Sequence, residues 1–379
     1  MKAFEAIRKN KAMLFGIAAA VAFILILNRS DIAIEYMKKG LKLCAATVIP
    51  SLFPFMVISE LIISSGVGMK VCRLLSRPMR ALFGVSEAGG CAFILGAICG
   101  FPIGARTAAS MYDKGVIGKK EFERLLSFCN NPGSAFVISA IGVSLFGNRR
   151  IGVMLYICVI LSAAIVGVLG RLFFGKENKK SEAVLSLSKD VSGVELFTSA
   201  IQNSALSMLT VCAYVAFFSS FVGCLGAILV SLGVPDGICA LIFGFFELSS
   251  GVCMAAEAVS STKAILLCAA FSGWSGLSVH FQIMTICAGR GISFKPFFIA
   301  KAAQGVICAL LVGICLRFFS PFGDLSSEIF VNAGETASFS SPSLLCFLFF
   351  FASVCPIILN LFDRKKLSSK NQKKFQKRS

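Results

Sequence analysis

The sequence predicts an all-α polytopic membrane protein that is internally duplicated. Of its 379 residues, 56% are hydrophobic and only 15% are charged, and the mean hydropathy is +0.84. A soluble domain is closer to half apolar and a quarter charged. The apolar residues gather in blocks of about 17–25 residues, the length that a helix needs to cross a bilayer. The membrane class therefore follows from composition and spacing alone.

Ten hydrophobic segments are candidate spans, and not all of them need to cross the membrane completely. In chain order they are Ala12–Leu27, Leu43–Ser64, Cys91–Ser110, Leu125–Leu145, Ile151–Phe174, Ala205–Leu232, Gly237–Val259, Ala264–Cys287, Phe297–Phe319 and Ser343–Phe362.

The first two segments carry local signals. The N-terminal apolar run continues to Asn28 without a convincing cleavage site, so we expect a signal anchor or first span rather than a signal peptide. Asp31–Lys42 alternates apolar and charged residues at helical spacing, which predicts a helix in the membrane interface. Pro50 and Pro54 interrupt the second segment, and glycine–proline clusters interrupt the third and fourth.

A polar segment, Gly175–Ser192, divides the chain into two parts that look alike. Gly167 and Arg171 fall on Gly313 and Arg317 at one constant offset. Four blocks recur in the same order, which predicts an internal duplication. The paired blocks are Ile94–Gly104 with Ile242–Gly251, Phe128–Phe136 with Phe271–Phe281, Leu145–Gly152 with Cys287–Ser293, and Ile165–Phe174 with Leu311–Phe319. The expected units are an N-terminal span and interfacial helix (1–42), a first repeat (43–174), a polar linker (175–196), a second repeat (197–319), and a C-terminal span with a basic cytoplasmic tail (320–379).

The net charge of +18 does not indicate a nucleic-acid partner. The 37 basic residues, against 19 acidic ones, lie mostly between apolar blocks and at the two ends of the chain. The positive-inside rule places them there. The dense basic cluster in Asp363–Ser379 predicts a cytoplasmic C-terminus and attraction to anionic membrane lipids.

No metal site, cofactor or catalytic set is expected. The 16 cysteines form no C-x-x-C pair, and most lie in apolar blocks, where cysteine behaves as a small hydrophobe. The chain has a single histidine and no G-x-S-x-G, H-E-x-x-H or Walker motif. We therefore predict that the protein is not an enzyme.

CGFPIGARTAAS (Cys99–Ser110) breaks an apolar segment and places a cation after the break. Pro102 removes a donor and kinks the helix, while Gly100 and Gly104 permit close backbone approach. A helix broken at membrane depth exposes free N–H groups that can hold an anion. Arg106, on the first turn after the break, pairs either with an anionic substrate or with an internal carboxylate, and the alternative is a packing kink with Arg106 at the cytoplasmic interface. Two acids within apolar segments could neutralise it, Glu60 and Glu257.

FCNNPGSAF (Phe128–Phe136) is a second candidate site element. Asn130 and Asn131 bring amide groups into an apolar segment, Pro132 helps to end a helix, and Ser134 can cap the next one. Polar side chains inside a bilayer are expensive and usually functional. The alternative is that the asparagines join helices by hydrogen bonds.

The second repeat carries different chemistry at the corresponding places. Glu247, followed by Ser249, stands near the position of the glycine–proline break. Trp274 and Ser275 precede His280, whose charge changes near neutral pH. Glu247 and His280 are the candidate ion-coupling groups, although a lone histidine in an apolar segment is more often structural.

The run Cys99–Gly152 closely resembles the YlbJ-type sporulation integral membrane proteins of endospore-forming bacteria. These carry the nucleoside recognition, or gate, domain also met in concentrative nucleoside transporters, and the similarity extends from about Leu43 to Phe319. The resemblance implies a fold like that of the concentrative nucleoside transporters, with broken helices and re-entrant hairpins around a midplane site. It also implies a carrier in the outer forespore membrane whose cargo is dipicolinate, a small aromatic dicarboxylate.

A dianion in a low-dielectric site needs positive charge or several N–H donors, and an aromatic ring suits a stacking partner such as Trp274. The coupling ion is expected to be Na⁺ or H⁺, and a homo-oligomer is left open. The residues expected to bind substrate are Pro102, Gly104, Arg106, Asn130, Asn131, Ser134, Ser249, Trp274 and Ser275.

Two other functions stay open. An ion-coupled carrier of nucleosides or other neutral solutes would use Glu247 and the asparagines and would not need Arg106. A non-transporting scaffold would recruit sporulation proteins through the basic linker Asp113–Arg124 and the C-terminal tail.

Overall fold

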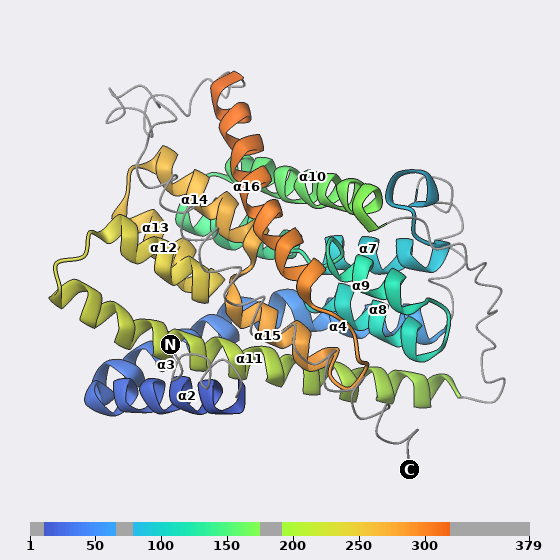
Figure 1. The fold of residues 1–379 in the computed structure, drawn as a ribbon, viewed down its shortest axis with the longest axis horizontal. Coiled ribbons are helices and arrows are strands. Elements are labelled where there is room, and N and C mark those ends of the chain that lie inside the picture. The colour runs from blue at the N-terminus through green and yellow to red at the C-terminus, as the bar shows by residue number, and fades with distance from the viewer. Residues whose placement is uncertain (1–10, 66–78, 175–191, 319–379) are drawn as a thin grey trace, which may run out of the picture.

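The structure, a computed structural model, describes residues 11–65, 79–174 and 192–318, and every regular element in these ranges is a helix (Figure 1). The first part of the chain forms α2 (Lys11–Asn28), α3 (Ser30–Leu43), the π-helical η1 (Cys44–Val48), α4 (Ile49–Ser64), the π-helical η2 (Met79–Phe83), α7 (Glu87–Cys99), α8 (Ile103–Asp113), α9 (Lys119–Leu126), the π-helical η3 (Phe136–Leu145) and α10 (Arg149–Phe174). The second part forms α11 (Gly193–Ser231), α12 (Asp236–Phe246), α13 (Leu248–Ala258), α14 (Ser261–Trp274), α15 (Gly276–Ile286) and α16 (Lys295–Phe318).

Four stretches of the described helices are long and apolar enough to cross a membrane. They are Arg149–Arg171, Gly193–Ser231, Thr262–Ile286 and Lys295–Phe318. A fifth is present if α2 and α3, which are bent by 100° at Arg29, form one span. These helices confirm the prediction of an all-α polytopic membrane protein.

The ten hydrophobic segments of the sequence do not all become single helices. Ile151–Phe174 and Phe297–Phe319 correspond to α10 and α16, whereas Cys91–Ser110 and Gly237–Val259 are each divided between two short helices. The tenth segment, with the basic tail, lies outside the described residues.

Neither Pro50 nor Pro54 ends the helix in which it lies. α3, η1 and α4 follow one another directly, and α4 runs across Pro54. A proline ring clashes with the carbonyl four residues earlier, which for Pro50 belongs to Ala46 in η1. The wider π-helical turn gives that carbonyl room. The expected interruption is thus a local change of helix type.

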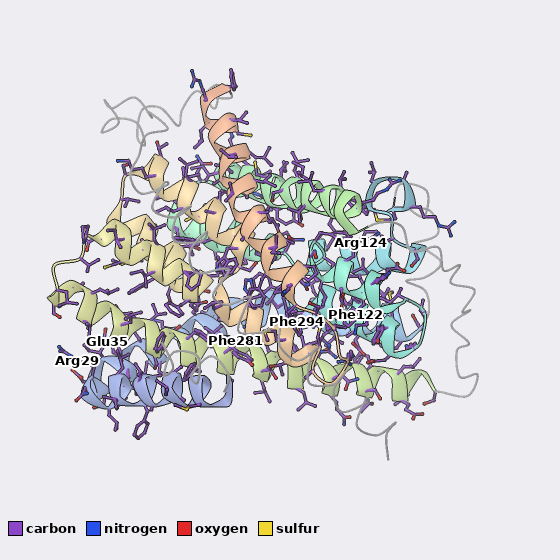
Figure 2. All side chains as sticks on the ribbon, in the orientation of Figure 1. Arg29, Glu35, Phe122, Arg124, Phe281 and Phe294 are labelled. Carbon is purple, nitrogen blue, oxygen red and sulfur yellow. The ribbon has the colours of Figure 1, made fainter. Side chains whose placement is uncertain are left out.

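The outer surface of the helices is apolar. Val21 and Phe23 on α2 and Leu206 and Leu209 on α11 are all exposed. Figure 2 shows side chains projecting outward from these helices as well as between them. Water-facing surfaces rarely carry so many large apolar side chains, whereas lipid hydrocarbon favours them. The exposed residues therefore agree with an integral membrane protein.

The same order of elements occurs twice along the described chain. The hairpin α7–α8 is followed by α9 and η3, which are separated by an irregular break, and then by α10. The hairpin α12–α13 is followed by α14 and α15, which are separated at Ser275, and then by α16. Both hairpins place glycines between their arms. A methyl group on Gly96 would lie 3.0 Å from the Cα of Gly104, and one on Gly251 would overlap Gly244.

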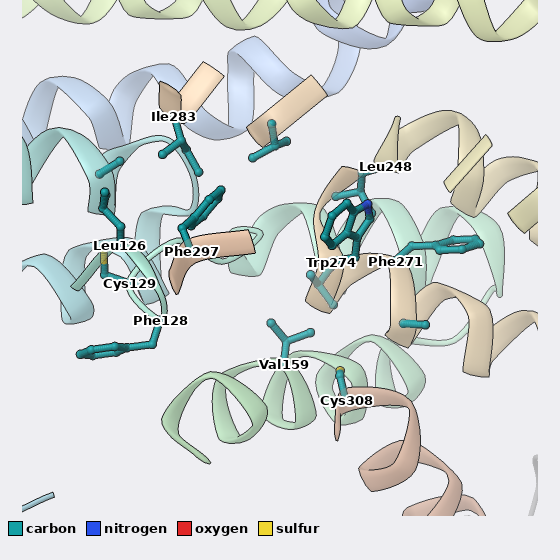
Figure 3. Close-up of a cluster of buried hydrophobic side chains, with 14 of the residues drawn as sticks. Leu126, Phe128, Cys129, Val159, Leu248, Phe271, Trp274, Ile283, Phe297 and Cys308 are labelled. Atoms are coloured by element: carbon teal, nitrogen blue, oxygen red, sulfur yellow. The ribbon is translucent and has the colours of Figure 1, made fainter. Parts of the chain in front are cut away.

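One apolar core lies between the elements of both parts. Figure 3 shows Phe128 near the break after α9 and Val159 on α10 together with Phe271, Trp274 and Phe297 from α14 and α16. All five side chains are fully or almost fully buried. The hairpins and breaks are therefore held against a shared interior.

A set of polar contacts joins α8 and α9 to the loop after α15. Arg290 binds Asp113 through two nitrogens at 2.8 and 2.5 Å. The hydrogen-bonded Arg290 guanidinium holds the pKa of the Asp113 carboxyl below its usual range. Lys119 and Glu123 of α9 bind backbone atoms of the same loop at 2.5 and 2.7 Å. Charged side chains of the linker Asp113–Arg124 therefore bind groups of the same chain.

Candidate functional site

The tip of the α7–α8 hairpin lies directly on the break that follows α9. α7 ends at Gly100, whose φ of +85° is a conformation that other residues rarely adopt. The peptide N–H of Phe101 donates to the carbonyl oxygen of Asn131 at 2.8 Å. A methyl group on Gly104 would overlap the carbonyl oxygen of Cys129. The two motifs singled out in the first repeat are therefore in backbone contact.

Among the residues that the structure describes, no side chain caps the N-terminus of α8. Its N-cap residue is Pro102, which offers no polar side chain, and the helix starts at Ile103. The first peptide N–H groups of any helix lack partners within the helix. Gly104 and Ala105 on this first turn are buried. This N-terminus is thus a place where peptide dipoles favour negative charge.

Asn130 and Asn131 are completely buried and belong to a hydrogen-bond network with α16. Asn131 Nδ2 donates to the Phe128 carbonyl at 2.9 Å, and its Oδ1 accepts from Gln304 Nε2 at 2.7 Å. The Asn130 carbonyl oxygen accepts from Lys301 Nζ at 2.7 Å. The Asn131 side chain and the Asn130 backbone carbonyl therefore join the break to a distant helix. The Asn130 side chain instead donates to the Leu126 carbonyl at 3.1 Å, and its Oδ1 is left without a partner among the described residues.

Sequence reasoning missed Lys301 and Gln304. Lys301 is fully buried, and its Nζ also donates to Gln304 Oε1 at 2.8 Å. The signal was present in FIAKAAQGV (Phe298–Val306), where a lysine and a glutamine three residues later share one face of an otherwise apolar helix. An ionisable residue in the interior of a membrane span is a functional candidate by default.

Ser134 serves α7 rather than the helix that it begins. Its hydroxyl donates to the carbonyl oxygen of Ile98 at 3.4 Å, and no side-chain cap is found at the start of η3. The expected cap is therefore replaced by a second contact between the hairpin and the break.

Arg106 lies between α4, α8 and α11. Its guanidinium donates to the Asn203 carbonyl at 2.9 Å, to the Ser207 hydroxyl, and to Glu60 Oε2 at 3.4 Å. The side chains of Arg106 and Glu60 are 20% and 23% exposed. Of the two acids that could neutralise Arg106, Glu60 is therefore the one in contact with it in this conformation.

Glu247 caps a helix in the second hairpin. Its two carboxylate oxygens accept from the peptide N–H groups of Ser249 at 3.0 Å and Ser250 at 2.6 Å, at the N-terminus of α13. A methyl group on Gly276 would lie 2.9 Å from the peptide nitrogen of Leu248. The second hairpin tip therefore also meets a helix break, and its N-terminus already holds a carboxylate.

Trp274 and His280 pack against aromatic side chains of the protein itself. The Trp274 ring stacks on the Phe245 ring, with 5.5 Å between their centroids. The centroid of the His280 ring lies 4.1 Å from that of Trp274. His280 Nδ1 lies 2.6 Å from the Gly276 carbonyl, which can only accept, so Nδ1 carries the proton. His280 Nε2 has no partner among the described residues. Ser275, with φ of +76°, forms the turn between α14 and α15.

The fold and these breaks define an all-helical integral membrane protein with irregular backbone packed inside it. No family model matches the chain, and no solved structure matches it. The chain is similar to the sporulation integral membrane protein YlbJ of Bacillus subtilis (strain 168), with 29% identity over 319 residues, which cover 76% of this chain and 78% of the relative. This similarity confirms the resemblance to YlbJ-type sporulation integral membrane proteins.

Proposed function

We propose that this protein is a carrier of a small anionic solute and not an enzyme. The solute that the resemblance favours is dipicolinate, moved from the mother cell across the outer forespore membrane during sporulation. Transport would proceed by alternating access around a site at the middle of the membrane, formed by two duplicated halves of the concentrative-nucleoside-transporter type. The repeated order of hairpin, broken helix and long helix supports the duplication.

A difference between the two hairpins carries the proposal. In the second hairpin the Glu247 carboxylate occupies the N-terminus of α13. In the first hairpin no side chain of the described residues caps the corresponding N-terminus, that of α8. A carboxylate is the natural ligand of a helix N-terminus because the peptide N–H groups and the helix dipole both favour it. We infer that a carboxylate of the solute takes at α8 the place that Glu247 takes at α13.

Arg106 supports an anionic rather than a neutral solute. It follows the α8 N-terminus by one turn, and its side chain is partly accessible. Its pairing with Glu60 at 3.4 Å is longer than a strong charged hydrogen bond. Exchange of this partner for a solute carboxylate would compensate the charge of the dianion as it enters a low-dielectric site. Asn130, Asn131, Ser249 and Ser275 would complete the site as the two hairpins move.

The scaffold function is less well supported. It needs a linker whose charges are free to recruit partners. Asp113, Lys119 and Glu123 each bind groups of the loop after α15 instead. These contacts hold the linker against its own chain.

Transport assays with purified protein in liposomes test the proposal. Liposomes with the full-length chain are given labelled dipicolinate or a labelled nucleoside, under imposed Na⁺ or proton gradients, and empty liposomes are the control. Dipicolinate uptake above that of empty liposomes is the expected result. Uptake of nucleoside alone would favour the neutral-solute carrier, and uptake of neither under any gradient would contradict both carrier functions.

A further inference from the structure

A buried cation at the break after α9 belongs to the chain itself. We propose that Lys301 is a built-in cation: its ammonium fills an oxygen-lined position at which a free monovalent cation would otherwise be needed to hold the broken helix. Asn130 and Gln304 supply the oxygens, Asn131 orients Gln304, and all three residues are completely buried.

The partners of the ammonium are neutral oxygens of the kind that bind monovalent cations. Lys301 Nζ donates to the Asn130 carbonyl at 2.7 Å and to Gln304 Oε1 at 2.8 Å. These lengths are those of hydrogen bonds from a charged nitrogen. The helix break removes the Asn130 carbonyl from regular pairing, and an unpaired carbonyl at membrane depth is costly. The ammonium compensates this cost.

The glutamine is oriented so that only its oxygen faces Lys301. Gln304 Nε2 donates to Asn131 Oδ1 at 2.7 Å and to the Val159 carbonyl at 3.3 Å. Both partners can only accept in these contacts, so the amide nitrogen must point toward them. Gln304 Oε1 is thereby presented to the lysine as an acceptor, and Lys301 must be the donor.

Within the described ranges, no carboxylate pairs with Lys301. The described ion pairs of the interior do not include it, and its Nζ donates to the Asn130 carbonyl and to Gln304 Oε1. Figure 3 shows the surroundings of this position, with Cys129 beside the break and Cys308 on α16. Two neutral oxygens therefore stabilise the charge in place of an acid.

The built-in cation is found at one of the two described breaks, the one that follows α9. The offset that pairs Arg171 with Arg317 also pairs Lys301 with Leu155 and Gln304 with Cys158. The α10 helix of the first half thus has apolar and thiol side chains where α16 has the charged pair. Because the fold forms its second break without such a pair, the lysine is not simply a requirement of the architecture.

The consequence for coupling rests on the proposed carrier function. A position that is filled by a tethered ammonium does not need to bind and release Na⁺ in each transport cycle. We therefore expect no Na⁺ requirement at the break after α9. The structural part of the inference can be tested without any solute, so its failure is distinguishable from failure of the carrier function.

The test is thermal unfolding of the full-length protein in detergent, in choline, sodium, potassium or methylammonium chloride at equal ionic strength. The wild type should unfold at the same temperature in all four salts, apart from any sodium effect that Glu247→Gln abolishes. Lys301→Ala should unfold on the order of 5 °C lower in choline chloride. Sodium or methylammonium should restore at least half of this shift by entering the vacated position. Lys263→Ala, which removes an exposed lysine from α14, is the matched control and should respond to no salt.

Three results would overturn the proposal. One is a Lys301→Ala variant whose unfolding temperature no cation restores. The second is a Lys301→Met variant, similar in length but uncharged, that is as stable as the wild type. The third applies even if both variants fail to fold: a sodium-specific rise in the unfolding temperature that the wild type shares with Glu247→Gln, which would mean that a free cation still fills a position outside the candidate ion-coupling group.

Discussion

The peptide N–H of Phe101 donates to the carbonyl oxygen of Asn131 at 2.8 Å, so the tip of one hairpin is bound to the break of another helix. In the second part of the chain, Gly276 at the helix break also lies close to Leu248 at the hairpin tip. Each hairpin tip is therefore in contact with a helix break, and in the first part a backbone hydrogen bond joins the two. In the proposed carrier, movement of the first hairpin would break this hydrogen bond and free its peptide groups for the solute.

Replacement of Gly104 by alanine should disrupt the contact between the α7–α8 hairpin and the break after α9. The added methyl group would overlap the carbonyl oxygen of Cys129, and a backbone atom cannot move aside as a side chain can. We expect a loss of about 1–3 kcal/mol or more, measured as a lower unfolding temperature in detergent.

Gly170→Ala is the matched control for this change. Among the described residues, no atom lies within 4 Å of a methyl group at Gly170 on α10, so the substitution should be neutral or stabilising by up to about 1 kcal/mol through helix propensity. Equal unfolding temperatures for the Gly104 and Gly170 variants would show that the hairpin does not pack on Cys129 as described.

Arg106→Ala should abolish dipicolinate uptake in liposomes and leave the protein folded in the membrane. The partly exposed guanidinium compensates the charge of the dianion in the proposed site. Arg106→Lys should retain part of the uptake, because it keeps the charge but loses the planar two-contact geometry.

The double variant Arg106→Gln with Glu60→Gln separates the two interpretations of Arg106. If the arginine only neutralises Glu60, removal of both charges should restore uptake. If it binds the solute, the double variant should be as inactive as Arg106→Gln alone. Uptake at the wild-type level in Arg106→Ala would remove this residue from the site altogether.

Composition and motif order were sufficient to predict the class of fold and the places where helices break. CGFPIGARTAAS and FCNNPGSAF both lie at breaks because proline and glycine act locally, and local effects are visible in a single sequence. The prediction that the prolines of the second segment interrupt its helix was wrong. A π-helical turn accommodates Pro50, and the helix continues.

The partners across the break could not be predicted, because they depend on tertiary contacts. Lys301 meets Asn130 from 171 positions away, and no periodicity links the two. Glu247 stays a candidate ion-coupling group, and in this conformation its carboxylate caps α13, a local contact that the following serines allow. Packing decides which of several plausible roles a polar residue takes.

Glu247→Gln should destabilise the protein by about 1–2 kcal/mol. Each carboxylate oxygen accepts from a different peptide N–H, and an amide can supply only one acceptor while its NH₂ group opposes the other donor. The loss of negative charge at the N-terminus of α13 adds to this effect.

Glu257→Gln is the control, since it removes an exposed carboxylate from the same helix. Thermal unfolding of both variants in sodium and in choline chloride is the measurement. A Glu247→Gln variant as stable as Glu257→Gln would contradict the capping role, and a sodium dependence lost only in Glu247→Gln would support ion coupling.

The contact between Asp113 and Arg290 should contribute stability that depends on pH. Arg290 lowers the pKa of Asp113, so the folded state favours the carboxylate more than the unfolded state does. This contribution is present in full above the unfolded pKa of about 3.9 and is lost as the pH falls through the lower folded value. The unfolding temperatures of the wild type and Asp113→Asn should therefore differ by a constant amount between about pH 5 and 8 and converge below about pH 4.

Because the Asp113 side chain is 48% exposed, the difference should be small and should shrink further in high salt. Arg290→Gln should show the same loss, with no further loss in the double variant, whereas a difference that grows as the pH falls would mean that the carboxyl is stabilised in its protonated form.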